Sequence, residues 1–78
     1  KHLFKTLDKE DQVILRVRGN VGRVVACGST VDRASLGEDV VFSGGLEFTY
    51  GGMQYVSARN HNILAKVTKE SVKKEDAA

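Results

Sequence analysis

The side chains that could carry out covalent or acid–base chemistry are few and widely separated in this sequence. Cys27 is the single cysteine, and it ends an apolar run directly before a glycine. A catalytic cysteine needs a neighbouring base and a lowered pKa, but His2 and His61 both lie far from it along the chain. His61 stands between two asparagines, a pattern typical of a solvated turn. We therefore expect Cys27 to fill space in a small core and neither histidine to act as a base.

The remaining candidates for catalysis or metal binding also have simpler explanations. Glu38 and Asp39 are adjacent, and neighbouring residues of a strand point to opposite faces of a sheet, so they should not share a substrate. The glycine-rich stretches do not precede a helix, which phosphate-binding glycine loops require. One cysteine and two scattered histidines lack the spacing of a zinc site. The sequence predicts no enzymatic activity, no metal and no cofactor bound by this chain.

Length and composition restrict the class of protein further. The 78 residues are enough for one small domain, and 12 basic against 10 acidic side chains leave a net charge of only +2. That balance argues against an obligatory polyanionic partner, and no apolar run reaches the ~20 residues of a membrane span. The unpaired cysteine fits a reducing compartment, and no secretory leader pattern is visible, so we expect a cytoplasmic protein. A core this small supplies only about 3–5 kcal/mol of stability, and oligomerisation is the remedy that the composition leaves open.

Apolar and polar residues alternate along most of the chain, which predicts β-strands. In residues 13–17, Val13, Leu15 and Val17 share one face, and in residues 46–50 the apolar side chains again share a face, as a core stripe would. The Gly51-Gly52 pair between two alternating runs predicts a tight hairpin. The other expected strands are residues 23–27, 40–42, 53–56 and 63–67, with a possible short strand at 2–5 and a polar turn at 58–62.

Five to seven short strands joined by glycine turns predict an all-β fold, a small irregular barrel or sandwich. We expect this domain to cover residues 1–67. Residues 68–78 have Val72 as their one branched apolar side chain, so we expect a loose charged tail. Short apolar strands near both chain ends are candidates for pairing with other copies, because uncovered sheet edges recruit strands.

A second function class is suggested by arginines around the first predicted turn and aromatic residues on the predicted hairpin. Basic residues beside stacking rings are typical of small barrels that bind single-stranded nucleic acid. The apparent core stripe and the low net charge count against this alternative. The residues are Arg16, Arg18, Arg23, Phe48, Tyr50 and Tyr55.

Four stretches, taken in order, resemble the GroES-type co-chaperonins (the chaperonin-10 family). The opening "LFKTLDKEDQVILRV" resembles that family's N-terminal segment, although Thr6 stands where the family usually has proline. "GRVVACG" resembles its Gly-x-Val-x-Ala-x-Gly strand, and "LGEDVVFSGG" resembles its Val-Gly-Asp-x-Val-x-Phe stretch. "FTYGGMQYVSARNHNILAKV" resembles its glycine hairpin and final Ile-Leu-Ala-x-Val strand. Together these stretches cover most of residues 3–67.

The resemblance implies an irregular β-barrel whose work is assembly and docking. In that family seven copies form a ring that caps a chaperonin cage, where unfolded client proteins fold while the chaperonin, not the cap, binds and hydrolyses ATP. The N-terminal strand of one copy would pair with the last strand of its neighbour. By resemblance, this subunit interface comprises Leu3, Phe4 and Lys5 against Ile63, Leu64, Ala65, Lys66 and Val67.

Two departures from the family matter. Only residues 29–35 fill the place of the family's roof hairpin, so the dome should have an open top, as in some bacteriophage co-chaperonins. The family's long chaperonin-docking loop is also not visible: it is naturally absent, deleted, or missing from this sequence, and no chaperonin-contacting residues are assigned. The remnant that joins the two strands is Arg18, Gly19, Asn20, Val21 and Gly22.

A third hypothesis is that the chain is a piece of a larger enzyme, because some dehydrogenases contain a GroES-like domain. The chain has no Gly-x-Gly-x-x-Gly pattern for a dinucleotide, so this hypothesis has the least support.

Overall fold

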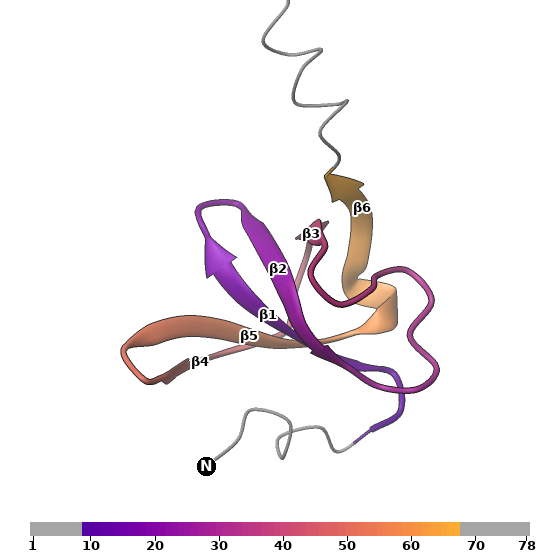
Figure 1. The fold of residues 1–78 in the computed structure, drawn as a ribbon, viewed down its shortest axis with the longest axis horizontal. Helices are drawn as coiled ribbons and strands as arrows, with labels where there is room; N and C mark the ends of the chain where they lie inside the picture. The colour runs from indigo at the N-terminus through magenta and orange to yellow at the C-terminus, as the bar shows by residue number, and fades with distance from the viewer. Residues whose placement is uncertain (1–8, 68–78) are drawn as a thin grey trace, which may run out of the picture.

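Six strands form one antiparallel sheet in the computed structural model of this chain, which describes residues 9–67 (Figure 1). The order across the sheet is β4-β5-β1-β2-β3-β6. The all-β prediction is therefore confirmed, as are its six main strands. The possible strand at residues 2–5 and the tail at 68–78 lie outside the described residues. The strands are β1 (Gln12–Arg18), β2 (Val21–Cys27), β3 (Asp39–Phe42), β4 (Leu46–Tyr50), β5 (Met53–Arg59) and β6 (Ile63–Val67).

Two hairpins are closed by two-residue glycine turns. Arg18 pairs with Val21 across Gly19-Asn20, where Gly19 has a φ of 63° and Asn20 does not have a positive φ, the pattern of a type II′ turn. The predicted hairpin at Gly51-Gly52 is confirmed: both glycines have positive φ, 59° and 80°, as a type I′ turn requires. Both turn types match the right-handed twist of the strands that they join.

A bulge in β2 divides the buried residues between the two faces of the sheet. Ile14 pairs with Ala26 but Leu15 pairs with Val24, so Val25 is the extra residue. As a result Val24 and Ala26, which would share a face in a regular strand, pack into different clusters. Ile14, on the face of β1 opposite to Val13 and Leu15, is also fully buried, in the second cluster.

The two clusters are of unequal size. The main cluster contains Val13, Leu15, Val24, Ala34, Val40, Val56, Ala58 and Ile63. The second consists of Ile14, Ala26 and Tyr55, with Val25 and Phe48 packed against it.

Polar contacts hold the connection between β2 and β3 against the body of the sheet. Residues 28–38 contain no strand, so no hairpin stands between β2 and β3, in agreement with the short gap in the sequence. The Gly28 N–H donates to the Gln12 carbonyl at 2.8 Å. Asn60, in the 3₁₀ turn η2 (Asn60–Asn62), accepts from the Arg33 N–H at 3.1 Å and donates to Asp32 Oδ1 at 2.7 Å. This network links the connection to the end of β5.

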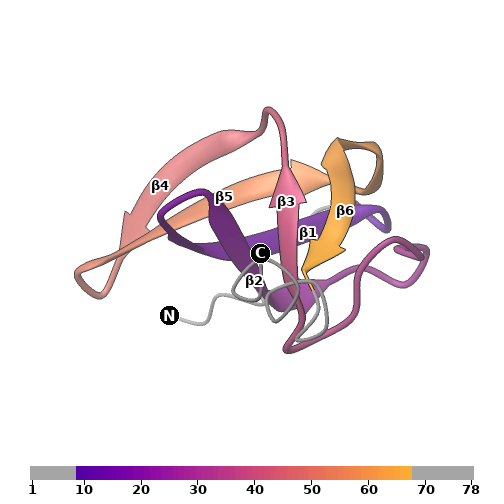
Figure 2. The same cartoon turned by 90° about the horizontal axis from the view of Figure 1, so that it is seen from above.

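The expected core stripe on β4 is wrong. Leu46 is 75% exposed and Tyr50 is 41% exposed, and of the three apolar side chains only Phe48 is packed against a cluster. The reason is that, within residues 9–67, β4 is an edge strand that pairs only with β5, and the hairpin of β4 and β5 extends beyond the other strands (Figure 2). The predicted turn at 58–62 also begins later, because Ala58 is buried within β5.

Candidate functional site

The reactive side chains of the described residues are not brought together. Cys27 is half-buried and packs against the main cluster. His61 is exposed in η2, and His2 lies outside the described residues. Residues 9–67 contain no group of three His, Cys, Asp or Glu side chains that could hold a metal ion. The side chains that do gather lie on the two faces and the two borders of the sheet.

Glu38 and Asp39 each hold a different neighbour in place. Asp39 Oδ1 accepts a hydrogen bond from Arg23 Nε at 2.9 Å, and this bond raises the pKa of the Arg23 guanidinium. Glu38 Oε1 accepts from the Ser35 N–H at 2.8 Å and lies 3.4 Å from Lys66 Nζ. The two carboxylates therefore do not face a common site.

The outer border of β6 is one candidate docking surface. Within residues 9–67, β6 pairs with β3 alone and forms one edge of the sheet. Val41 pairs with Ala65 and Phe42 with Ile63, so Leu64 is the extra residue of a bulge, and it is 62% exposed. Ile63 beside it is buried in the main cluster. The border thus presents an apolar side chain from a strand that is anchored in the core, while its expected partner at residues 3–5 lies outside the described residues.

The stretch that stands in place of the docking loop is part of a complete hairpin. Arg18 ends β1 and Val21 begins β2, so Gly19 and Asn20 are the turn residues. Gly22 is buried, and a Cβ built on it would lie 2.9 Å from Leu15 Cβ. Gly22 therefore serves close packing, and this end of the sheet carries no free loop.

Strand register aligns aromatic and arginine side chains in one row, which the sequence alone did not indicate. Phe48 pairs with Tyr55, Tyr55 with Arg16, and Arg16 with Arg23. Directly opposed residues of antiparallel strands point to the same face, so the row crosses β4, β5, β1 and β2. Arg18 and Tyr50 each lie two positions beyond a member of this row on the same strand, and therefore on the same face of the sheet. We call the resulting surface the aromatic–arginine face. Its members are Arg16, Arg18, Arg23, Phe48, Tyr50 and Tyr55.

The arginines of this face surround one hollow. Arg16, Arg18 and Arg23 line it together with Val21, Asp39 and Val67, and its volume is about 180 Å³. Arg23 is neutralised by its ion pair with Asp39. Arg16 and Arg18 form no ion pair with any carboxylate of the described residues, so two guanidinium charges remain uncompensated beside the rings.

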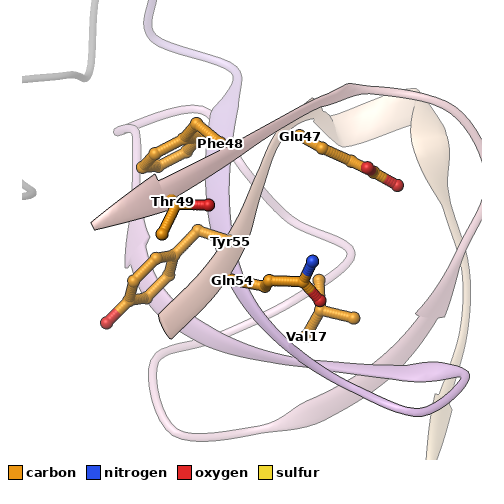
Figure 3. Close-up of a pocket in the computed structure, with 6 residues that line it drawn as sticks. All are labelled: Val17, Glu47, Phe48, Thr49, Gln54 and Tyr55. Atoms are coloured by element: carbon orange, nitrogen blue, oxygen red, sulfur yellow. The ribbon is translucent and has the colours of Figure 1, made fainter. Parts of the chain in front are cut away.

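A second hollow, of about 210 Å³, is lined by residues of the hairpin of β4 and β5, including Phe48 and Tyr55, and by Val17. Figure 3 shows Glu47, Gln54 and Val17 on the side of the ribbon opposite to the rings of Phe48 and Tyr55. The one carboxylate on this hairpin is therefore separated from the aromatic–arginine face by the sheet itself.

Comparison with known proteins finds no family model that matches this chain. No curated protein matches it either. No helix in residues 9–67 has the length and apolar character needed to cross a membrane.

Proposed function

We propose that this chain is the subunit of a GroES-type co-chaperonin, a ring of seven copies that caps a chaperonin chamber. The observation that carries the proposal is the outer border of β6, where Leu64 is 62% exposed next to the buried Ile63. Within residues 9–67, β6 is an edge strand, so one row of its backbone N–H and C=O groups is available to pair with another chain, and an exposed apolar side chain beside that row would be covered by the partner. Each of the four stretches that resemble the family contains a strand of this sheet within residues 9–67.

Ring assembly would close the open sheet. In the proposed contact, residues 3–5 of one copy add a strand to β6 of the next, which completes an irregular barrel across the subunit boundary. The contact is heterologous, and a heterologous contact that closes on itself generates a ring without free edges. It would also add apolar burial to a domain that is short of it.

The assembled ring would act as a lid and not as a catalyst. ATP would be bound and hydrolysed by the chaperonin, and unfolded clients would fold inside the closed chamber in the cytoplasm. Because no hairpin follows β2, the dome would be roofless, as in the bacteriophage variants.

The subunit contact is tested by native mass spectrometry of the full chain and two matched variants. Leu64→Asp places a charge on the β6 border, and Leu36→Asp places one on the connection between β2 and β3, where Leu36 is exposed to the same extent, 63%. We expect a sevenfold mass for the parent chain and for Leu36→Asp, and a monomer for Leu64→Asp. A monomeric parent chain, or a Leu64→Asp ring of unchanged mass, would overturn the proposed interface.

The capping function needs a separate experiment. The parent chain is mixed with a bacterial double-ring chaperonin in the presence and absence of ATP, and cofractionation and the refolding yield of a denatured client are measured. We expect ATP-dependent cofractionation and a higher yield. Assembled rings that neither cofractionate nor raise the yield would leave the interface intact and refute the lid.

A further inference from the structure

We propose that the aromatic–arginine face is a second binding surface, distinct from the β6 border, and that it takes a single-stranded stretch of nucleic acid. In this arrangement a base stacks on the ring of Tyr50, which is 41% exposed, and successive phosphates lie beside Arg16 and Arg18. The proposal rests on the register of four strands and is independent of the proposed ring.

The rings form a supported platform. Tyr55 is only 8% exposed and occupies the centre, stacked on Phe48 with a centroid distance of 5.5 Å and an interplanar angle of 20°. Tyr50 meets Tyr55 edge-on at 6.4 Å and is itself 41% exposed. Tyr55 is held by the second cluster, and the rings of Phe48 and Tyr50 both pack against it. Preordered aromatic rings suit stacking of unpaired bases of any sequence.

Positive charge lies directly beside the platform. Arg16 is the register partner of Tyr55, so it stands on the neighbouring strand, about 4.8 Å away along the sheet. Arg18 is two residues further along the same strand, about 7 Å from Arg16, a separation at which consecutive phosphates of an extended strand can each reach one guanidinium. The planar guanidinium group pairs with phosphate through two hydrogen bonds.

Among residues 9–67, the acidic groups near this surface do not cancel its charge. Asp39 lies in the arginine hollow but is held by Arg23 at 2.9 Å. Glu47 lies on the opposite side of the hairpin (Figure 3). The described residues therefore give a positive local charge beside the rings, although the whole chain carries only +2.

The combination of rings and arginines favours unpaired nucleic acid over other anions. An acidic peptide would satisfy the arginines but not the rings, and the stacked bases of a duplex cannot open onto a flat sheet face without unpairing. With two phosphates engaged, the logarithm of the affinity should fall against the logarithm of the salt concentration with a slope of about −1.4. That slope corresponds to about a sevenfold loss of affinity between about 50 and about 200 mM salt.

The test is fluorescence anisotropy of labelled oligo-dT and oligo-rU with the full chain and four variants. Tyr50→Ala should weaken binding about tenfold, because one stacking contact is lost. Arg16→Gln combined with Arg18→Gln should weaken it further and bring the salt slope close to zero. Lys9→Gln removes an exposed charge away from this face, and Glu47→Gln changes the opposite face of the hairpin; both should bind as the parent does.

Several outcomes would overturn the proposal. They are an absence of binding at low salt, unchanged binding by the arginine double variant, an equal loss in Lys9→Gln, and binding of poly-glutamate as tight as that of oligo-dT. Circular dichroism shows whether each variant is folded, and native mass spectrometry shows whether its assembly is unchanged. Failure of nucleic-acid binding with intact rings would leave the co-chaperonin proposal standing.

Discussion

Replacing Gly28 by alanine tests how the connection after β2 is fitted to the start of β1. The Gly28 N–H donates to the Gln12 carbonyl at 2.8 Å, and the Thr30 N–H donates to the Glu10 carbonyl at 3.0 Å. A Cβ built on Gly28 would overlap the Glu10 carbonyl and lie 2.9 Å from the Lys9 carbonyl oxygen. Gly28 does not have a positive φ, so the substitution is sterically, not conformationally, unfavourable.

The expected cost can be estimated from these contacts. The backbone at residues 9–10 must move away, which weakens two hydrogen bonds that contribute about 1 kcal/mol each. Crowding of a packed site typically costs about 1–3 kcal/mol more. Alanine also restricts the unfolded chain, which offsets about 0.4–1 kcal/mol. The net loss is therefore about 2–4 kcal/mol, a large part of the about 3–5 kcal/mol expected for a domain of this size.

Urea unfolding followed by far-ultraviolet circular dichroism measures this loss at one fixed protomer concentration, because assembly changes apparent stability. Gly37→Ala is the matched control: Gly37 has a φ of 83°, and a Cβ there meets no atom within 4 Å, so its cost is only the left-handed conformation, about 1–2 kcal/mol. A Gly28→Ala protein that is as stable as Gly37→Ala, or more stable, would refute the steric reasoning.

Substitutions at three further positions probe other contacts of the fold. Asp11 Oδ1 accepts from Arg59 Nε at 2.8 Å, and this hydrogen bond lowers the pKa of the carboxyl below 3.8. The stabilisation by this ion pair is therefore present above that pH and is lost as the pH falls through the pKa of Asp11 in the folded protein. In Asp11→Asn, the midpoint of urea unfolding should therefore fall less steeply at acid pH than in the parent chain. An equally steep fall would contradict this. Asn60→Ala should cost about 1–2 kcal/mol and speed hydrogen exchange of the Arg33 amide, and a fully protected amide would argue against it. Gly51→Ala should lower the free energy of unfolding by about 1–2 kcal/mol because φ at this position is 59°. Gly51→Asn should lower it less, because asparagine is favoured in this turn type. Thermal unfolding measures both, and equal losses of stability would contradict the turn assignment.

The strands were predictable because their signals are local. Alternation of side chains has the same period wherever a strand lies in a sheet, and Gly51-Gly52 permits positive φ without reference to the rest of the chain. Ile63 could be assigned to the last strand for the same reason. The bulge at Val25 had no such signal, because an extra residue is defined by the partner strand that it fails to pair with.

For the candidate surfaces too, the sequence indicated some features and not others. The arginines and aromatic residues of the face were recognisable from their types and positions, as was an apolar last strand. The alternation on β4 nevertheless suggested a buried stripe, because a period of two shows that apolar side chains share a face but not whether anything covers that face.

Local backbone preference and side-chain alternation thus determined from sequence that this is an all-β chain with glycine-closed hairpins. Only the tertiary structure decided that β4 and β6 are the borders, that Leu46 and Leu64 are exposed, and that Tyr55 lies beside Arg16. Those properties depend on which strands become neighbours and in what register. Pairing energies between residues far apart in the chain decide that choice, and no short stretch of sequence contains them.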